Sequence, residues 1–260
     1  MTNLTLLALD TSTEACSVAL LYNGEKTYLN ELAQRTHAKR ILPMVDEILT
    51  DSGLKLNQLD ALAFGRGPGS FTGVRVGAAI AQGLALGTDL PVIPISNLTA
   101  MAQAAFELYQ AENVAAAIDA RMNEVYFSQL VREKKCTDFG QFFVWKNLIP
   151  EQVCSPEKAL VQLANSTALN ITTSTALNIA TSTALNITAS TALRVGTGWN
   201  AYAQFATKGL TGSDIELPDA RYMLELARVE WLQQKTISAL EIEPIYLRNE
   251  VTWKKLAGRE

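Results

Sequence analysis

The chain has 260 residues, with 22 basic and 26 acidic side chains, a net charge of −4 and an isoelectric point near 5.2. This balance argues against a protein that grips nucleic acid mainly through a basic face. Three widely separated cysteines exclude a disulfide framework and a structural zinc site. The first apolar run stops at Asp10 and no run approaches ~18 apolar residues, so we expect a cytoplasmic protein without a signal peptide or membrane span.

The first half of the chain predicts a sheet followed by alternating helices and strands. We expect strands at residues 4–10, 16–22, 25–32, 59–67 and 91–96. We expect helices at residues 36–52, 70–86 and 97–110, so that helices and strands alternate after the third strand. Asn23-Gly24 is a strong hairpin signal, and Ser70 or Thr72 can cap the second helix. This order resembles one half of a ribonuclease-H-like α/β fold.

The second half partly restarts the pattern. We expect two strands around a turn at 121–123, a strand at 141–145, a helix at 155–165 and a strand–turn–helix segment at 194–205. A helix at 219–235 and an extended tail at 243–260 should follow. The restart predicts a boundary near residue 105, with an N-terminal lobe at 1–105 and a C-terminal lobe at 106–260.

An octapeptide repeat occupies residues 166–193, with the units STALNITT, STALNIAT, STALNITA and STALRV. Its leucines would drift by about 80° per unit on a helix, whereas an even period keeps them on one face of a strand. The repeat is either an added binding surface or a neutral expansion within a surface loop, where extra length costs little free energy.

Asp10, Thr11 and Ser12 follow the first buried strand directly. An aspartate and small hydroxyl side chains in such a turn can hold a metal–phosphate group, as actin-like ATPases do. The alternative is a tight hairpin in which the three side chains satisfy the local backbone.

The sequence FGRGPGSFTGVRVG at 64–77 leads into a helix but lacks the lysine of a Walker loop. Arg66 and Arg75 flank that helix start, and no acidic residue lies between Asp60 and Asp89. Two cations there oppose the helix dipole, which indicates either an external anionic partner or simple solvation.

Small residues at 73, 77 and 81 form a smooth strip along the same helix. Glycine inside a helix is unfavourable by about 1 kcal/mol relative to alanine, so the strip needs a compensating contact. That contact is either the sheet beneath the helix or a helix of a partner protein.

His37 is the only histidine, which excludes a histidine-rich metal site and leaves no nucleophile–base pair with a recognisable elbow. We interpret His37 as a residue of a helix start or an interface.

Five segments together resemble the bacterial TsaB (YeaZ) family: LALDTSTEACSVALL, THAKRILPMVDEIL, LDALAFGRGPGSFTGVRVGAAIAQGLA, AIDARMNEVYF and PIYLRNEVTWKK. The resemblance covers nearly the whole chain outside 166–190. It implies an actin-like (ASKHA) α/β fold of two ribonuclease-H-like lobes. It also implies a non-catalytic role beside TsaD, which transfers a threonylcarbamoyl group to a tRNA adenosine next to the anticodon.

The resemblance further implies a heterodimer with TsaD, a ternary complex with the ATPase TsaE, a homodimer through the same surface, and only indirect contact with tRNA. TsaD binds metal with a His-x-x-x-His helix, and our alignment places Asn97 and Met101 at the two histidine positions. No resident cofactor is expected, apart from weak or partner-dependent ATP or ADP binding at Asp10, Thr11 and Ser12.

The family's dimer surface consists of the two helices that flank the glycine loop. Carried onto this chain, the resemblance favours a partner helix against the small-residue strip. The expected interface residues are His37, Ile41, Leu42, Val45, Gly73, Val74, Arg75, Val76, Gly77, Ile80, Ala81 and Leu84.

Three other functions remain as alternatives. An actin-like kinase or ATPase would turn over substrate alone, a peptidase would need a metal or a nucleophile–base pair, and a homodimeric module could act outside tRNA modification.

Overall fold

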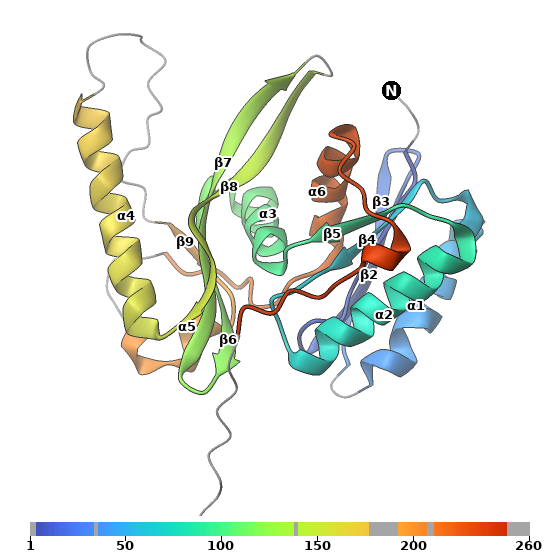
Figure 1. The fold of residues 1–260 in the computed structure, drawn as a ribbon, viewed down its shortest axis with the longest axis horizontal. Coiled ribbons are helices and arrows are strands. Elements are labelled where there is room, and N and C mark those ends of the chain that lie inside the picture. The colour runs from blue at the N-terminus through green and yellow to red at the C-terminus, as the bar shows by residue number, and fades with distance from the viewer. Residues whose placement is uncertain (1–3, 34–35, 138–139, 177–191, 207–210, 249–260) are drawn as a thin grey trace, which may run out of the picture.

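The structure is a computed structural model that describes residues 4–33, 36–137, 140–176, 192–206 and 211–248. It has a mixed α/β fold built on two sheets (Figure 1). No helix within these ranges is long and apolar enough to cross a membrane.

The first sheet has the strand order β3-β2-β1-β4-β5. Its strands are β1 (Leu6–Asp10), β2 (Ala15–Tyr22), β3 (Glu25–Leu32), β4 (Ala61–Gly65) and β5 (Val92–Ile95). The first three strands are antiparallel neighbours, while β4 and β5 continue the sheet parallel to β1. The parallel arrangement brings the carboxyl ends of β1, β4 and β5 to one edge, where the candidate site lies.

Helices cover both faces of this sheet. They are α1 (His37–Asp51), α2 (Phe71–Thr88) and α6 (Ala220–Leu232). Side chains of β1 alternate between faces: Leu7 and Leu9 pack with α1 and α2, whereas Leu6 and Ala8 pack with α6. We call β1–β5 with these three helices the five-stranded half.

The second sheet has the order β8-β7-β6-β9. Its strands are β6 (Asn113–Arg121), β7 (Glu124–Thr137), β8 (Gly140–Cys154) and β9 (Leu193–Val195). Helices α4 (Pro156–Ala176) and α5 (Gly198–Ala201) cover one face, and α3 (Asn97–Tyr109) covers the face toward the first sheet (Figure 1). We call β6–β9 with α4 and α5 the four-stranded half. Short 3₁₀ helices lie at Leu56–Gln58, Ala203–Phe205 and Ala239–Glu241.

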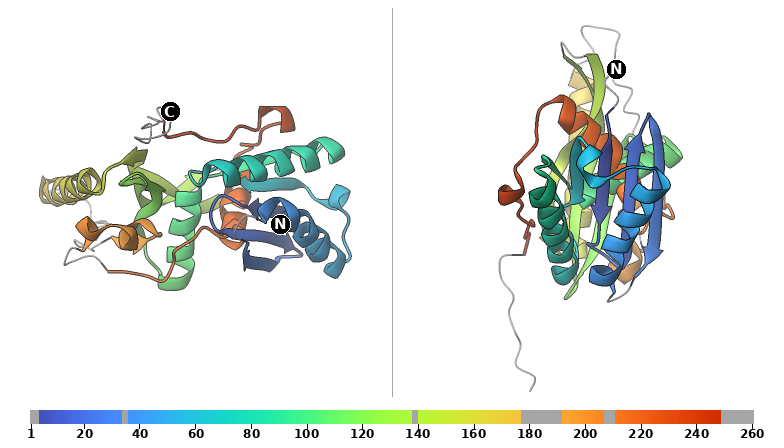
Figure 2. Two further views of the ribbon diagram at one scale, coloured as in Figure 1. Left: turned by 90° about the horizontal axis from the view of Figure 1, so that it is seen from below. Right: turned by 90° about the vertical axis from the view of Figure 1, so that its right-hand side faces the viewer.

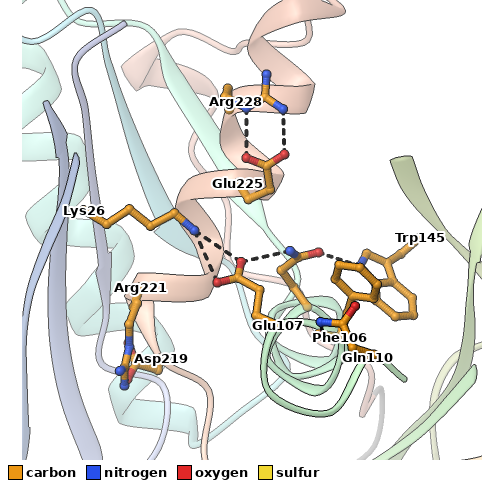
Figure 3. A network of polar contacts seen from close by, with 10 residues as sticks. Lys26, Phe106, Glu107, Gln110, Trp145, Asp219, Arg221, Glu225 and Arg228 are labelled. Atoms are coloured by element: carbon orange, nitrogen blue, oxygen red, sulfur yellow. Dashed lines mark hydrogen bonds and ion pairs between the residues drawn. The ribbon is translucent and has the colours of Figure 1, made fainter. Parts of the chain in front are cut away.

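Polar contacts join the two halves on the α6 side. Lys26 of β3 bonds Glu107 of α3 at 3.3 Å, and Glu107 accepts a bond from Gln103, whose amide oxygen accepts one from Trp145 Nε1 of β8 at 2.9 Å (Figure 3). These contacts connect an edge strand of the first sheet to an edge strand of the second through α3.

The predicted order of elements is found, with three differences. Strand β8 runs far beyond the predicted 141–145, because it pairs with β7 along its length. Helix α4 continues past 165 to Ala176, into the octapeptide repeat, whereas residues 177–191 of that repeat lie outside the described residues. The predicted tail is described only to Arg248.

The expected division of the chain at residue 105 differs from the packing. Although it comes late in the sequence, α6 packs on the first sheet, with Met223, Leu224 and Ala227 buried against Leu6 and Ala8. The C-terminal part of the predicted lobe 106–260 therefore returns to the five-stranded half.

Residues 237–245 also return to this half, whereas Arg248 contacts the β6–β7 turn of the other half, and we call residues 237–248 the C-terminal strap. Ile237 pairs with Val92 through two backbone hydrogen bonds, and Ile245 N–H donates to Arg66 O at 3.0 Å. The strap runs beside α2 (Figures 1 and 2).

Candidate functional site

Asp10 lies at the carboxyl end of β1 and is almost completely buried. Its Oδ1 accepts a hydrogen bond from Asn97 Nδ2 at 3.0 Å. Its Oδ2 accepts bonds from the Ser12 hydroxyl at 3.0 Å and the Ser12 backbone N–H at 3.3 Å. Asn97 also donates to Ser12 Oγ, and its own Oδ1 accepts from Gly67 N–H at 3.1 Å. Both carboxylate oxygens are thus engaged by donors of the same chain.

Glycines allow this network to close. A Cβ on Gly65 would collide with the Asp10 carboxylate, and one on Gly69 would collide with the Ser12 carbonyl. The backbone of the glycine loop therefore lies directly against the β1–β2 turn, and Ser70 N–H donates to Ser12 O at 2.6 Å. The glycines serve close packing between two loops of this chain.

Burial raises the pKa of Asp10 to about 6, and hydrogen bonds from Asn97 and Ser12 act in the opposite direction. Among the described residues, no group of three or more His, Cys, Asp or Glu side chains could hold a metal ion. Asp10 and Ser12 thus meet in one cluster, as the phosphate-loop hypothesis requires, but their polar atoms bond to the chain itself.

Thr11 points toward α2 and away from this cluster's carboxylate. Its hydroxyl donates to Gly73 O at 2.8 Å, and a Cβ on Gly77 would lie 2.9 Å from Thr11 Oγ1. A Cβ on Gly73 would collide with the Thr11 carbonyl, and Ala81 is fully buried. The smooth strip on α2 therefore faces the chain's own β1–β2 turn and core. The prediction that Gly73, Gly77 and Ala81 meet a partner helix is wrong for this reason.

The other predicted interface residues separate into two groups. Ile41, Val45 and Val74 are buried inside the protein, so they support the surface from below. The outward-facing or partly exposed group comprises His37, Leu42, Arg75, Val76, Ile80 and Leu84. The exposed side of α2 also carries features that the prediction missed: Phe71 is 69% exposed, Leu86 is 55% exposed, and a Cβ on Gly83 would meet open space.

The two arginines of the glycine loop differ. Arg66 Nη2 lies 3.2 Å from Glu151 of β8, so neither sequence-based interpretation, an external anion or simple solvation, describes Arg66. The sequence could not reveal this pair, because its partners are 85 positions apart. Arg75 has no carboxylate within 4.0 Å among the described residues; it lies over the Phe71 ring and faces the Tyr246 ring of the strap.

A cavity of about 560 Å³ lies between the two halves. From the five-stranded half it is lined by Ser12, Glu14 and Phe71, and from the other side by Arg121 and by Arg248 of the strap. Ion pairs Arg121–Glu14, at 3.7 Å, and Arg248–Glu124 lie at its border. No local sequence pattern indicates this cavity, because its walls come from distant segments.

The turn beside the cavity has an unusual backbone. Arg121, Met122 and Asn123 all have positive φ, between 58° and 63°. Non-glycine residues rarely adopt this conformation without support from their surroundings. Arg248 supplies such support by donating to the Ala120 carbonyl at 3.1 Å.

Comparisons with known proteins agree with this fold. A family model described as TsaD, tRNA N6-adenosine threonylcarbamoyltransferase, matches residues 29–255. The chain is 74% identical to the tRNA threonylcarbamoyladenosine biosynthesis protein TsaB of Haemophilus influenzae, over the whole of both chains. It is 42% identical to the protein of that name from Escherichia coli K12, over 98% of this chain and 99% of the relative.

Among solved structures, YeaZ from Pseudomonas aeruginosa superposes with a TM-score of 0.73 and 37% identity, covering 93% of this chain and all of that one. The fold and its matches thus define a relative of the threonylcarbamoyltransferase class. Within that class, the chain belongs to the TsaB (YeaZ) family, which confirms the resemblance seen in the sequence.

Proposed function

We propose that this chain acts in threonylcarbamoyladenosine synthesis on tRNA as a non-catalytic partner and activator of a TsaD-type transferase. The observation that carries the proposal is the closed cluster at the end of β1, where Asn97 bonds Asp10, Ser12 and Gly67. The names of the full-length relatives supply the pathway.

The two positions aligned with metal-binding histidines support the proposed lack of catalysis. Both the amide oxygen and the amide nitrogen of Asn97 are hydrogen-bonded to groups of the same chain. Met101 is fully buried in the hydrophobic cluster around α3, and its Cε lies 3.2 Å from the point where a Cβ on Gly196 would stand. Neither side chain is free to hold a metal as imidazole does.

The fold and the cofactor state are parts of the same proposal. We assign the two sheets to the two lobes of an actin-like fold, in which the end of β1 would contact a nucleotide phosphate. The isolated chain would bind ATP or ADP weakly or only with a partner, because the Asp10 carboxylate already accepts three hydrogen bonds.

The partner surface is the outer side of α1 and α2. Leu42 of α1 and Phe71 and Leu86 of α2 are between 44% and 69% exposed, and they are the large apolar side chains that a partner bound here would cover. TsaD would bind here, TsaE would join the pair, and a homodimer would form through this surface when TsaD is absent. The complex would work in the cytoplasm, with tRNA contacted mainly by TsaD.

The test is reconstitution of tRNA threonylcarbamoylation with purified TsaD and TsaE. Gly83→Trp adds a bulky ring on the open side of α2, and Val161→Trp, on an exposed position of α4, is the matched control. We expect Gly83→Trp to weaken TsaD binding at least tenfold and to lower tRNA modification in parallel, while Val161→Trp leaves both unchanged.

Each alternative function has its own outcome in this system. Modification or ATP turnover by the isolated chain would establish an enzyme, and peptide cleavage would establish a peptidase. Unchanged tRNA modification in cells depleted of the chain would favour a homodimeric module with another role.

A further inference from the structure

The cation on α2 has no counterpart within the described structure. We propose that Arg75, whose guanidinium lies against the rings of Phe71 and Tyr246, receives a carboxylate from the partner protein. This inference rests on the proposed function, since it concerns the surface assigned to TsaD. It identifies the chemical group on the partner that this surface recognises.

Arg75 carries an isolated positive charge near the start of α2. Arg75 is the only charged residue among the 18 of α2, and its first turn contains no acidic side chain. A cation near the N-terminal end of a helix opposes the helix dipole. The charge therefore does not stabilise α2 through the helix dipole.

Most other arginines of the described chain are paired with a carboxylate. Seven arginines of the described chain have a carboxylate within 4.0 Å, and Arg75 and Arg194 do not. Arg194 lies on β9 within the four-stranded half, near the Trp199 ring. Of these two arginines, Arg75 is the one that lies on α2, at the surface assigned to the partner.

The aromatic neighbours fix where the guanidinium points. Arg75 Cζ lies 3.4 Å from the Phe71 ring centroid and 4.7 Å from that of Tyr246, and Arg75 Nη1 donates to Phe71 O at 2.7 Å. Phe71 is 69% and Tyr246 is 47% exposed. A guanidinium that already rests against two rings loses less freedom when it bonds a carboxylate than a free one does.

Charge complementarity determines the kind of partner. Covering Arg75 with an apolar surface would bury a cation without a counterion, which is strongly unfavourable. A second copy would bring another arginine on its α2, and the exposed acids that it would bring to this surface, such as Asp46 and Glu47, lie on α1; the self-association arm of the experiment below tests this occupant. A different protein with an exposed aspartate or glutamate satisfies the site, and planar carboxylates match the guanidinium with two bonds.

The experiment measures binding of the full chain to purified TsaD for wild type, Arg75→Gln and Arg75→Glu, at low and high salt. Lys158→Glu is the matched charge reversal, because Lys158 is exposed on α4, far from α2 (Figure 1). We expect about a 30-fold loss of affinity for Arg75→Gln and a larger loss for Arg75→Glu. Lys158→Glu should bind like wild type, and salt should weaken wild type more than Arg75→Gln.

A charge exchange completes the test. An aspartate or glutamate of TsaD, replaced by lysine, should weaken wild-type binding and restore binding to Arg75→Glu. Equal affinity of all Arg75 variants for a TsaD that binds wild type would overturn this inference and leave the proposed function intact. Failure of wild type to bind TsaD would instead refute the proposed function. If Arg75→Glu changes only self-association, the occupant is a second copy and the inference is wrong.

Discussion

The polar groups on the two sides of α2 differ in whether they find partners within the chain. On the inner side, Asp10, Ser12 and Asn97 satisfy one another, and the backbone of the glycine loop fits against them without space for a Cβ. On the outer side, Arg75 is left without a carboxylate and Gly83 faces open space. The inner side is complete within one chain, whereas the proposed function assigns the outer side to contact with another molecule. Four predictions test this contrast.

The largest expected effect separates two glycines of the same helix. Gly73→Ala should lower the free energy of unfolding by about 3 kcal/mol, because its Cβ would collide with the Thr11 carbonyl, which is backbone. Gly83→Ala should raise it by about 1 kcal/mol, because it removes a glycine from an exposed helix position. Urea unfolding measures both. Similar effects of the two substitutions would show that the inner side is not closed.

The second prediction concerns pH and the buried carboxylate. Burial raises the pKa of Asp10 to about 6, so the folded state binds a proton more tightly than the unfolded state does. The contribution of Asp10 to the free energy of unfolding should therefore fall by about 3 kcal/mol as the pH rises from about 4 to about 6. At higher pH this contribution should stay level.

Asp10→Asn isolates this contribution. The difference in unfolding free energy between wild type and Asp10→Asn should follow the predicted curve, measured by denaturant unfolding at several pH values. Exposed carboxylates change both proteins equally, so they cancel in the difference. A difference that does not vary between pH 4 and pH 6 would show that water or an ion compensates the Asp10 charge.

How much the sequence predicts follows from the same contrast. The adjacency of Asp10, Thr11 and Ser12 at the end of a buried strand allows two interpretations, a phosphate loop or a tight hairpin that satisfies its own backbone. In the structure, Asp10 and Ser12 bond to each other and to Asn97. Thr11 instead bonds to α2, and the local motif could not show these distant partners. The direction faced by the small-residue strip was predicted wrongly. Glycine spacing shows that something lies close to a helix, but it does not distinguish the chain's own turn from a partner.

Long-range pairing accounts for the other differences. Arg66 finds Glu151 on β8, and the strap returns to α2 to place Tyr246 beside Arg75. Such contacts depend on how the two halves dock, which no local pattern of residues encodes. Composition, periodicity and caps predicted the order of helices and strands, because these are properties of neighbouring residues.

A smaller effect is expected from the hydroxyl that joins the β1–β2 turn to α2. Thr11→Val keeps the shape of the side chain but removes the donor to Gly73 O, which lies 2.8 Å away. Stability should fall by about 1 kcal/mol. Thr13→Val is the control, because the Thr13 hydroxyl only accepts a long hydrogen bond from Ala15 N–H at 3.4 Å. This substitution should lower stability by less. Thermal unfolding would reveal the ranking, and the reverse order would contradict the assigned role of Thr11.

The smallest expected effect on stability belongs to Arg75, whose effect on binding should be large. Arg75→Gln removes favourable contacts with two aromatic rings, but it also removes a cation that opposes the dipole of α2. Each contribution is about 0.5 kcal/mol at an exposed site, so they nearly cancel and the unfolding free energy should change by less than about 0.5 kcal/mol. Chemical denaturation of the isolated chain measures this value. A loss of 2 kcal/mol or more would mean that Arg75 holds the strap in place for the fold itself, and reduced partner binding by the variant would then reflect unfolding of this surface rather than a lost carboxylate contact.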